Sequence, residues 1–159
     1  MEEQTAITTV EELVELLDLT KLHTYELIAT ARDEHEEIPS DAEPVEPGDE
    51  RIRVRTGIRS REAGLDYRVE VSVEHARGQI LADMGAFYES SSPMELTGDS
   101  EEAVTEFGDR VAMMVLFPYL RQAISDLGHR VSVEITLPML RPGQLTFAPN
   151  EGEDDGDQA

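Results

Sequence analysis

The chain has 159 residues, the length of one domain, and it contains no cysteine, which excludes disulfides, thiolate metal sites and cysteine nucleophiles. Its 35 acidic and 13 basic residues give a formal net charge of −22, which disfavours nucleic acid and anionic lipid because phosphate groups attract clustered Lys and Arg. No stretch approaches the roughly 18 consecutive apolar residues of a membrane span, so we expect a cytoplasmic protein that does not insert into a membrane.

The first 32 residues predict a short helix and a strand. Residues 1–8 are expected to be disordered. Thr9 and Glu12 have the spacing of a capping box, which predicts a helix over 9–18. Its apolar stripe has helical spacing: Val10, Leu13, Val14 and Leu17. Residues 21–32 predict a strand. Four of its side chains are expected on one face: Tyr25, Leu27, Ala29 and Ala31.

An acidic, proline-containing stretch at 33–50 predicts a surface loop because it can bury little apolar area. Three strands are predicted after it. Residues 51–58 alternate apolar side chains with arginine, and residues 65–75 alternate apolar with mainly charged side chains. This pattern is typical of half-buried antiparallel strands, and it places arginines opposite acids on the wet face. Residues 79–89 are apolar on both faces, which predicts a central strand.

A long helix is expected from Asp99 or Ser100, as its cap, to about Leu127, with Gly128 as its stop. Its apolar stripe has spacings of four and three: Met113, Phe117, Leu120, Ile124 and Leu127. Pro118 lies within this pattern and predicts a kink. Further apolar residues make the stripe wider than one small sheet can cover, so we expect a second helix to pack against it.

Residues 129–142 are expected to be extended, and the acidic residues 151–159 are expected to be disordered. Strands followed by one long helix predict an α+β fold. In this fold a four-stranded antiparallel sheet carries a long kinked helix packed on one side, in a single domain over residues 9–150.

Signatures of enzymes are scarce in the sequence. The glycines are isolated, so no phosphate-binding loop is predicted. No nucleophile elbow is present. His23, His35, His75 and His129 lie on different predicted elements without the spacing of metal ligands. We therefore expect no catalytic residue, no metal and no cofactor.

A motif in the long helix resembles the SecB chaperone family. It runs Leu116-Phe117-Pro118-Tyr119-Leu120-Arg121, and the segment Thr136-Leu137-Pro138-Met139-Leu140 continues the match. Together with the preceding strands, the resemblance covers roughly residues 20–147. Leu116, Phe117, Pro118, Tyr119 and Arg121 match the family motif, and the resemblance implies a structural role for them in helix packing and in the kink.

The resemblance implies a holdase that binds unfolded chains in apolar grooves without ATP. It also implies a homotetramer, a dimer of dimers with the long helices at the interface. An acidic rim would attract basic unfolded chains, although a high-GC genome or a salt-adapted cytoplasm is the preferred explanation of the acidity. The residues expected to contact a client are Tyr25, Leu27, Phe87, Tyr88, Leu137, Met139, Leu140 and Phe147.

Two departures from the family pattern bear on the partner. The stretch 143–150 is short and contains Pro149, so the family's second helix is not expected, and the tail lacks Lys and Arg, which puts coupling to the SecA motor in doubt. The helix at 9–18 is similar to an addition in SecB-like chaperones that accompany toxin–antitoxin systems. The client is therefore either a dedicated partner, such as an antitoxin, or a range of precursor proteins.

The alternatives to a holdase are an interaction module that docks one folded partner and a small enzyme that uses an acidic pair.

Overall fold

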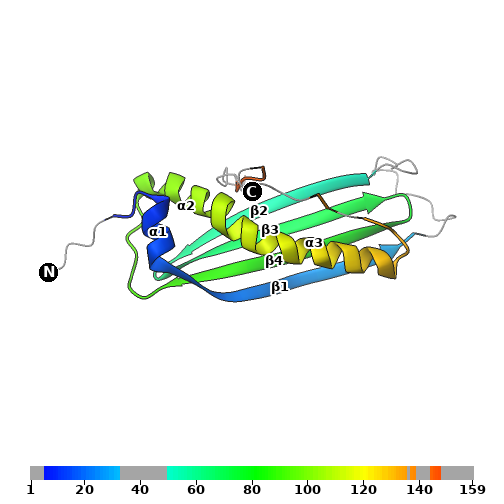
Figure 1. Ribbon diagram of the computed structural model, residues 1–159, viewed down its shortest axis with the longest axis horizontal. Helices are drawn as coiled ribbons and strands as arrows, with labels where there is room; N and C mark the ends of the chain where they lie inside the picture. The colour runs from blue at the N-terminus through cyan, green and yellow to red at the C-terminus, as the bar shows by residue number, and fades with distance from the viewer. Residues whose placement is uncertain (1–5, 33–49, 136, 139–143, 148–159) are drawn as a thin grey trace, which may run out of the picture.

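A computed structural model describes residues 6–32, 50–135, 137–138 and 144–147. It begins with helix α1 (Val10–Leu16) and four strands: β1 (Leu17–Ala31), β2 (Glu50–Arg61), β3 (Gly64–His75) and β4 (Gly78–Ser90). A continuous helical segment follows, made of a 3-10 turn η1 (Gly98–Ser100), α2 (Glu101–Phe107), a π turn η2 (Gly108–Ala112) and α3 (Met113–Arg130). The predicted α+β fold is confirmed (Figure 1).

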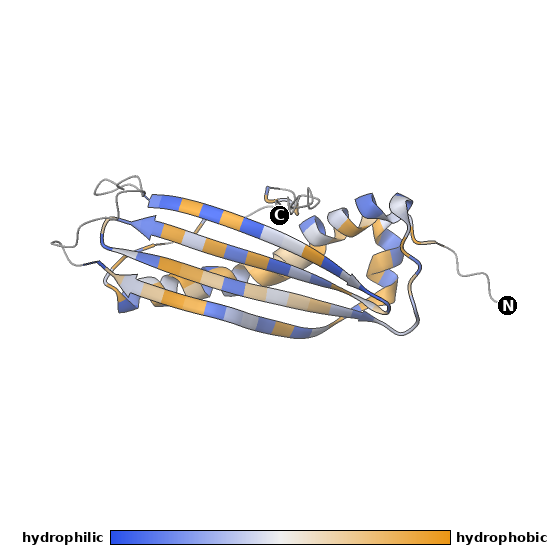
Figure 2. Ribbon diagram, turned by 180° about the vertical axis from the view of Figure 1, so that it is seen from behind, coloured by the Kyte–Doolittle hydropathy of each residue, from blue (hydrophilic) through white to orange (hydrophobic). Residues whose placement is uncertain are grey.

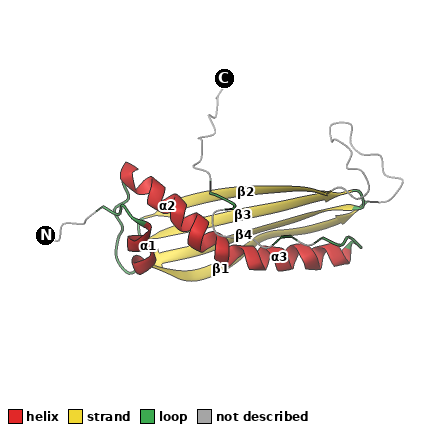
Figure 3. Cartoon of the chain, turned by 45° about the horizontal axis from the view of Figure 1, so that its top comes forward, coloured by secondary structure: helices red, strands yellow, loops and turns green. Residues whose placement is uncertain are grey.

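The four strands form one antiparallel sheet in the order β1-β4-β3-β2. β4 is a central strand, as its apolar side chains on both faces predict. The long helix lies across one face of the sheet, here called the covered face (Figure 3). Figure 2 shows the opposite face with no helix in front of it, and this is called the uncovered face.

The alternation of β3 decides which face is buried. Its side chains on the covered face are fully buried: Leu65, Tyr67, Val69, Val71 and Val73. On the uncovered face, the arginines of β2 lie opposite the acids of β3, as predicted. The guanidinium of Arg51 is 3.1 Å from the carboxylate of Glu74, and that of Arg61 is 2.8 Å from that of Asp66. Each such cross-strand pair contributes about 0.2–1 kcal/mol.

The long helix departs from its prediction at both ends. Ser100 does not cap it with its side chain; instead its hydroxyl accepts the N–H of Thr97 and donates to the carbonyl of Ile7. The helix also continues past Gly128 to Arg130. Gly128 has a different role, because a Cβ there would lie 2.5 Å from the carbonyl oxygen of Val133.

The π turn at Gly108–Ala112 is an irregularity that the sequence pattern did not reveal. Gly108 allows this turn to lie close to the sheet. A Cβ at this position would be 2.8 Å from Cε1 of Tyr67 and 2.7 Å from Cδ2 of Phe147. Pro118 lies inside α3, as expected. It removes one backbone donor from the helix.

The apolar stripe of the helix is covered within the single chain. Among the described elements, a second helix, α1, meets the long helix at α2. Phe107, Met113, Leu116, Leu120 and Ile124 are all buried. The sheet covers part of the stripe. The rest is packed with the C-terminal segment, which contributes four buried side chains to the same core: Val133, Ile135, Leu137 and Phe147. The described part of residues 131–138 forms no strand.

The N-terminal segment is more ordered than expected. Residues 1–5 lie outside the described residues, but Ile7 is buried and its N–H donates to the carbonyl of Glu95 at 3.2 Å. The capping box is confirmed, since the Thr9 hydroxyl accepts the Glu12 N–H and the Glu12 carboxylate accepts the Thr9 N–H. Hydrogen bonds from the backbone of Thr8 and Thr9 lower the pKa of Glu12.

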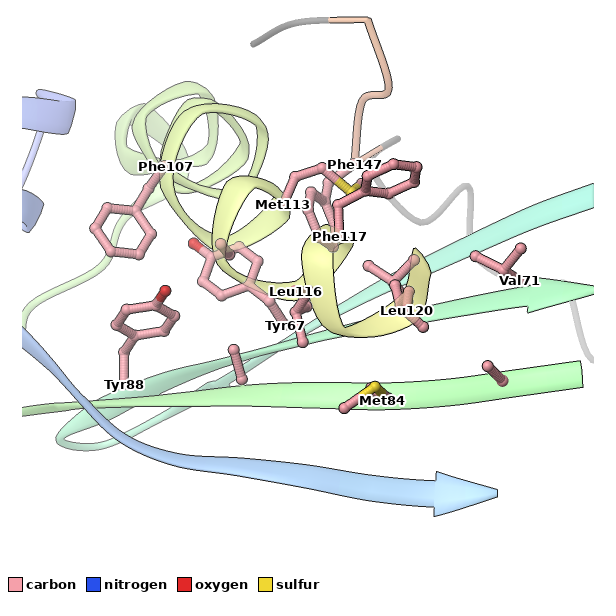
Figure 4. Packing of buried hydrophobic residues seen from close by; sticks show 14 of the residues in the cluster. Tyr67, Val71, Met84, Tyr88, Phe107, Met113, Leu116, Phe117, Leu120 and Phe147 are labelled. Atoms are coloured by element: carbon pink, nitrogen blue, oxygen red, sulfur yellow. The ribbon is translucent and has the colours of Figure 1, made fainter. Parts of the chain in front are cut away.

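Four aromatic side chains fill the core where α2 crosses the sheet (Figure 4). The rings of Tyr88 and Phe107 meet edge to face with centroids 4.9 Å apart, and those of Tyr67 and Phe147 meet with centroids 5.3 Å apart. The Tyr67 hydroxyl donates to the carbonyl of Val104 at 2.7 Å. The Tyr88 hydroxyl is buried without a hydrogen-bond partner among the described residues.

This difference predicts opposite effects of removing the two hydroxyls. Tyr67→Phe is expected to lower the free energy of unfolding by about 0.5–1.5 kcal/mol because a hydrogen bond is lost, and Tyr88→Phe is expected to be neutral or stabilising. Urea denaturation of both variants measures this. An equal loss of stability in the two variants would contradict the assignment of partners.

The same pair predicts how stability changes at alkaline pH. Burial raises the pKa of Tyr88 to about 12, above its value of about 10 in an unfolded chain. The unfolded chain therefore releases this proton first, and the free energy of unfolding falls as pH rises through that interval. Burial also raises the pKa of Tyr67. We expect Tyr88→Phe to lose less stability than the wild type between pH 10 and 12, as followed by urea denaturation at each pH.

Candidate client-binding surface

The edge strand β1 carries exposed apolar side chains on both faces because a bulge interrupts it. Thr24 pairs with Met84 and Glu26 pairs with Asp83, which leaves Tyr25 as the extra residue between them. Residues after the bulge therefore change face relative to a regular strand. The prediction that Tyr25 and Leu27 share a face is wrong for this reason. Leu27 lies opposite Ala82 on the covered face, whereas Tyr25 lies on the uncovered face.

Five apolar side chains on α1 and β1 are between 39% and 54% exposed, and together they are called the apolar edge: Val14, Leu19, Tyr25, Leu27 and Ile28. In the described part of the chain, β1 pairs only with β4. Its outer backbone groups are therefore open along a strand of 15 residues. A long apolar edge strand of this kind is a template for pairing with another extended chain.

A hollow of about 340 Å³ lies between β1 and α3 beside the apolar edge. Its apolar lining includes Leu27, Met84, Tyr119, Ala123 and Leu127. Its polar lining is Thr24, Gln122, Asp126 and Arg130. This arrangement can accept an apolar side chain and hold a polar neighbour at the rim.

On the uncovered face, Tyr25 is held by an ion pair beneath it. Arg68 donates two hydrogen bonds to Asp83, at 2.9 and 2.6 Å, and Asp83 is buried. These hydrogen bonds raise the pKa of Arg68. The Tyr25 ring lies over the guanidinium, with the ring centroid 3.9 Å from Cζ, which is a cation–π contact. The ion pair therefore fixes the position of one member of the apolar edge.

Phe87 extends the aromatic surface next to Tyr25. The ring of His23 lies between them, with its centroid 4.6 Å from that of Tyr25 and 6.2 Å from that of Phe87. Lys21 places its ammonium 5.7 Å from the Phe87 centroid. Phe87 is half-buried. Two predicted contact residues, Tyr25 and Phe87, thus come together on the uncovered face, and Leu27 lies on the covered face of the same strand.

The other predicted contact residues do not join them. Tyr88, Leu137 and Phe147 are buried in the core, so the prediction is corrected for these three, because a client does not reach them in this structure. Met139 and Leu140 lie outside the described residues.

The motif residues divide between the core and the surface. Leu116 and Phe117 are buried, whereas Pro118 and Tyr119 are exposed, and Tyr119 lines the hollow between β1 and α3. The Nε–H of Arg121 donates to the carbonyl of Leu137 at 2.8 Å. Arg121 therefore holds the C-terminal segment against the helix.

A hollow of about 710 Å³ lies along the acidic side of α2 and is lined by Asp99, Glu101, Glu102, Glu106 and Asp109 among others. No group of three or more His, Asp or Glu side chains in the described ranges is arranged to hold a metal ion. His23 lies opposite Gly85 and His75 opposite Gly78, on strands that are not neighbours. None of the helices in the described part of the chain is long and apolar enough to cross a membrane.

Comparison with solved structures identifies the architecture. The fold is similar to that of the SecB-like chaperone Rv1957 of Mycobacterium tuberculosis, solved in complex with a ChAD peptide from the HigA1 antitoxin Rv1956. The TM-score is 0.60, and the match covers 82% of this chain and 92% of that chain. The chain has a SecB-like fold. The sequence identity is 12%, so the likeness concerns the fold alone. No model of a known protein family matches the sequence, and no curated protein matches it.

Within this SecB-like fold, the sequence pattern missed three members of the apolar edge. Val14 was expected to face the core, but the short α1 buries only Val10 and Leu13. Leu19 falls between the predicted helix at 9–18 and the predicted strand at 21–32, whereas β1 begins at Leu17. Ile28 lies on the face opposite Leu27. The signal that could have found them is the excess of apolar residues in 13–28 over what one strand face can bury.

Proposed function

We propose that the chain is a cytoplasmic, ATP-independent holdase that binds unfolded or aggregation-prone polypeptides. The observation that carries this proposal is the apolar edge, five exposed apolar side chains on α1 and on the open edge strand β1, in a chain of net charge −22. A surface of this kind is unusual on a soluble monomer and marks a site of interaction. The SecB-like fold supports the same proposal.

An unfolded segment can use both the open backbone of β1 and its exposed apolar side chains. Its backbone pairs with the open side of β1, and its alternating side chains fall on the two faces. One set reaches Leu27 and the hollow beside α3, and the other reaches Tyr25 and Phe87. Burial contributes about 25 cal/mol per Å² of apolar surface. Binding of this kind needs no nucleotide and depends little on the sequence of the client.

The client is either a dedicated partner, such as an antitoxin, or a range of precursor proteins. The complex of the similar mycobacterial chaperone with an antitoxin peptide supports the dedicated partner. The proposal includes no step with the SecA motor, because the C-terminal sequence carries no Lys or Arg.

We propose further that the chain forms a homotetramer through the exposed side of α3. Support comes from Pro118, Tyr119 and Gln122, which form an exposed patch in the middle of that helix. Tyr119→Glu is expected to reduce the molar mass in solution, because a charge would be buried without a partner. Light scattering coupled to size exclusion measures this. A wild-type chain that is monomeric at all concentrations would remove the assembly from the proposal.

The function is tested by diluting a chemically unfolded model protein into increasing amounts of the chain without ATP, and by following light scattering. We expect suppression that saturates at a fixed molar ratio. Capture should slow at high salt if the acidic surface steers basic clients, while binding through apolar contacts persists. A folded chain that suppresses nothing, but forms a saturable complex with one folded partner, would instead support an interaction module.

A further inference from the structure

The second edge strand, β2, has a character opposite to that of β1. It carries five of the chain's 12 arginines in 12 residues. It pairs with β3 without a register shift from Glu50 to Arg61, and in the described part of the chain it has no neighbour on its other side. β2 is therefore a regular, open, basic strand in an acidic protein.

Two of its arginines retain most of their hydrogen-bonding capacity. The side chains of Arg55 and Arg59 are 79% and 76% exposed. Their closest carboxylates, on Glu70 and Asp66, are 3.7 and 3.8 Å away, beyond hydrogen-bonding distance. Each guanidinium has five donors in a planar fork that matches a carboxylate, so both can bind a further acid.

Between these arginines lies Gly57, on the same face of the strand. A Cβ at Gly57 would meet no heavy atom within 4 Å. A hollow of about 290 Å³ lies there, lined by Arg55, Thr56, Gly57, Arg68 and Glu70. An aromatic side chain from a neighbouring strand can cover an edge glycine, and Arg55 lines this hollow together with Arg68, which lies opposite Gly57 on β3.

We propose that β2 accepts an extended acidic segment of the client as a fifth strand. The segment has an acid opposite Arg59, an aromatic residue opposite Gly57 and an acid opposite Arg55, in the alternating order acid-x-aromatic-x-acid. The inference rests on the proposed function, since it names a second contact for the client of the holdase. A second copy of β2 does not fit this edge, because antiparallel pairing centred on Gly57 would place Arg55 opposite Arg59, and like charges in that position repel.

The binding is tested with a fluorescent nine-residue peptide, Ser-Thr-Glu-Val-Tyr-Val-Glu-Thr-Ser, by anisotropy with the full chain at about 0.15 M salt. A peptide with both Glu replaced by Lys is the control, and we expect it to bind at least about tenfold more weakly. The double variant Arg55→Glu, Arg59→Glu should reverse this preference. Equal binding of the two peptides by the wild type would overturn the inference.

Gly57→Val provides a variant that keeps the fold. Valine is favoured in strands, and its side chain enters open space, so thermal stability should not fall. The variant should nevertheless lower the affinity for the acidic peptide about tenfold, because the valine side chain fills the place of the aromatic ring. Undiminished binding would contradict the proposed register. If the wild type does not bind the acidic peptide but still suppresses aggregation, this inference is overturned and the proposed function stands. Leu27→Asp should weaken suppression while the peptide still binds, which separates the two surfaces.

Discussion

Replacement of Phe117 by alanine is expected to lower the free energy of unfolding by about 3–5 kcal/mol. The ring is buried in the core, where Figure 4 shows it beside Met113 and Phe147. Its removal leaves a cavity that the surrounding strands cannot close without distortion, because the sheet is paired along its whole length. Both the transfer free energy of the ring and the cost of the cavity contribute to the loss.

Gln122→Ala is the matched control for this variant. This variant also places alanine in the interior of the same helix, but at an exposed position. It should change the free energy of unfolding by no more than about 0.5 kcal/mol. Urea denaturation followed by circular dichroism measures both variants. If the midpoint for Phe117→Ala coincides with that of the wild type, Phe117 does not fill the core as described.

The second large effect is expected at Leu27. Leu27→Asp should reduce the affinity for an unfolded client about tenfold or more, because full burial of a leucine is worth about 1.5–3 kcal/mol and each 1.4 kcal/mol is a factor of ten. The side chain is exposed in the structure and lines the hollow beside α3. The fold should therefore tolerate the change, with little effect on the melting temperature.

Leu27→Met is the conservative control, since it keeps the apolar volume. It should retain the suppression of aggregation that Leu27→Asp loses, as measured by light scattering with an unfolded model protein. The molar mass of each variant is measured in parallel. A lower mass for Leu27→Asp with unchanged suppression would mean that the apolar edge joins copies of the chain rather than binding clients.

The strands with regular alternation could be predicted from sequence, whereas the edge strand could not. In β3, every second side chain from Leu65 to Val73 is buried, because its pattern is uninterrupted and both its neighbours are strands. In β1, the bulge at Tyr25 reverses the alternation. Neither glycine nor proline marks the bulge, so the period of the sequence carries no sign of it.

The candidate site was only partly predictable for a related reason. Tyr88, Leu137 and Phe147 were expected to contact a client. Tyr88 is buried against Phe107 of α2. Leu137 and Phe147 are buried because the irregular C-terminal segment packs into the core, held by the hydrogen bond between Arg121 and Leu137. Such a segment has no periodicity, and its position depends on contacts between residues far apart in the chain.

Hydrogen exchange of the intact chain, with and without a permanently unfolded client, tests the central claim most directly. Backbone amides on the open side of β1 have no partner in the described structure and should exchange rapidly in the free chain. We predict that the client slows exchange within residues 19–28, while the amides of β3 stay protected throughout. Unchanged exchange in residues 19–28, under conditions in which the client's aggregation is suppressed, would contradict the assignment of the apolar edge as the client-binding surface.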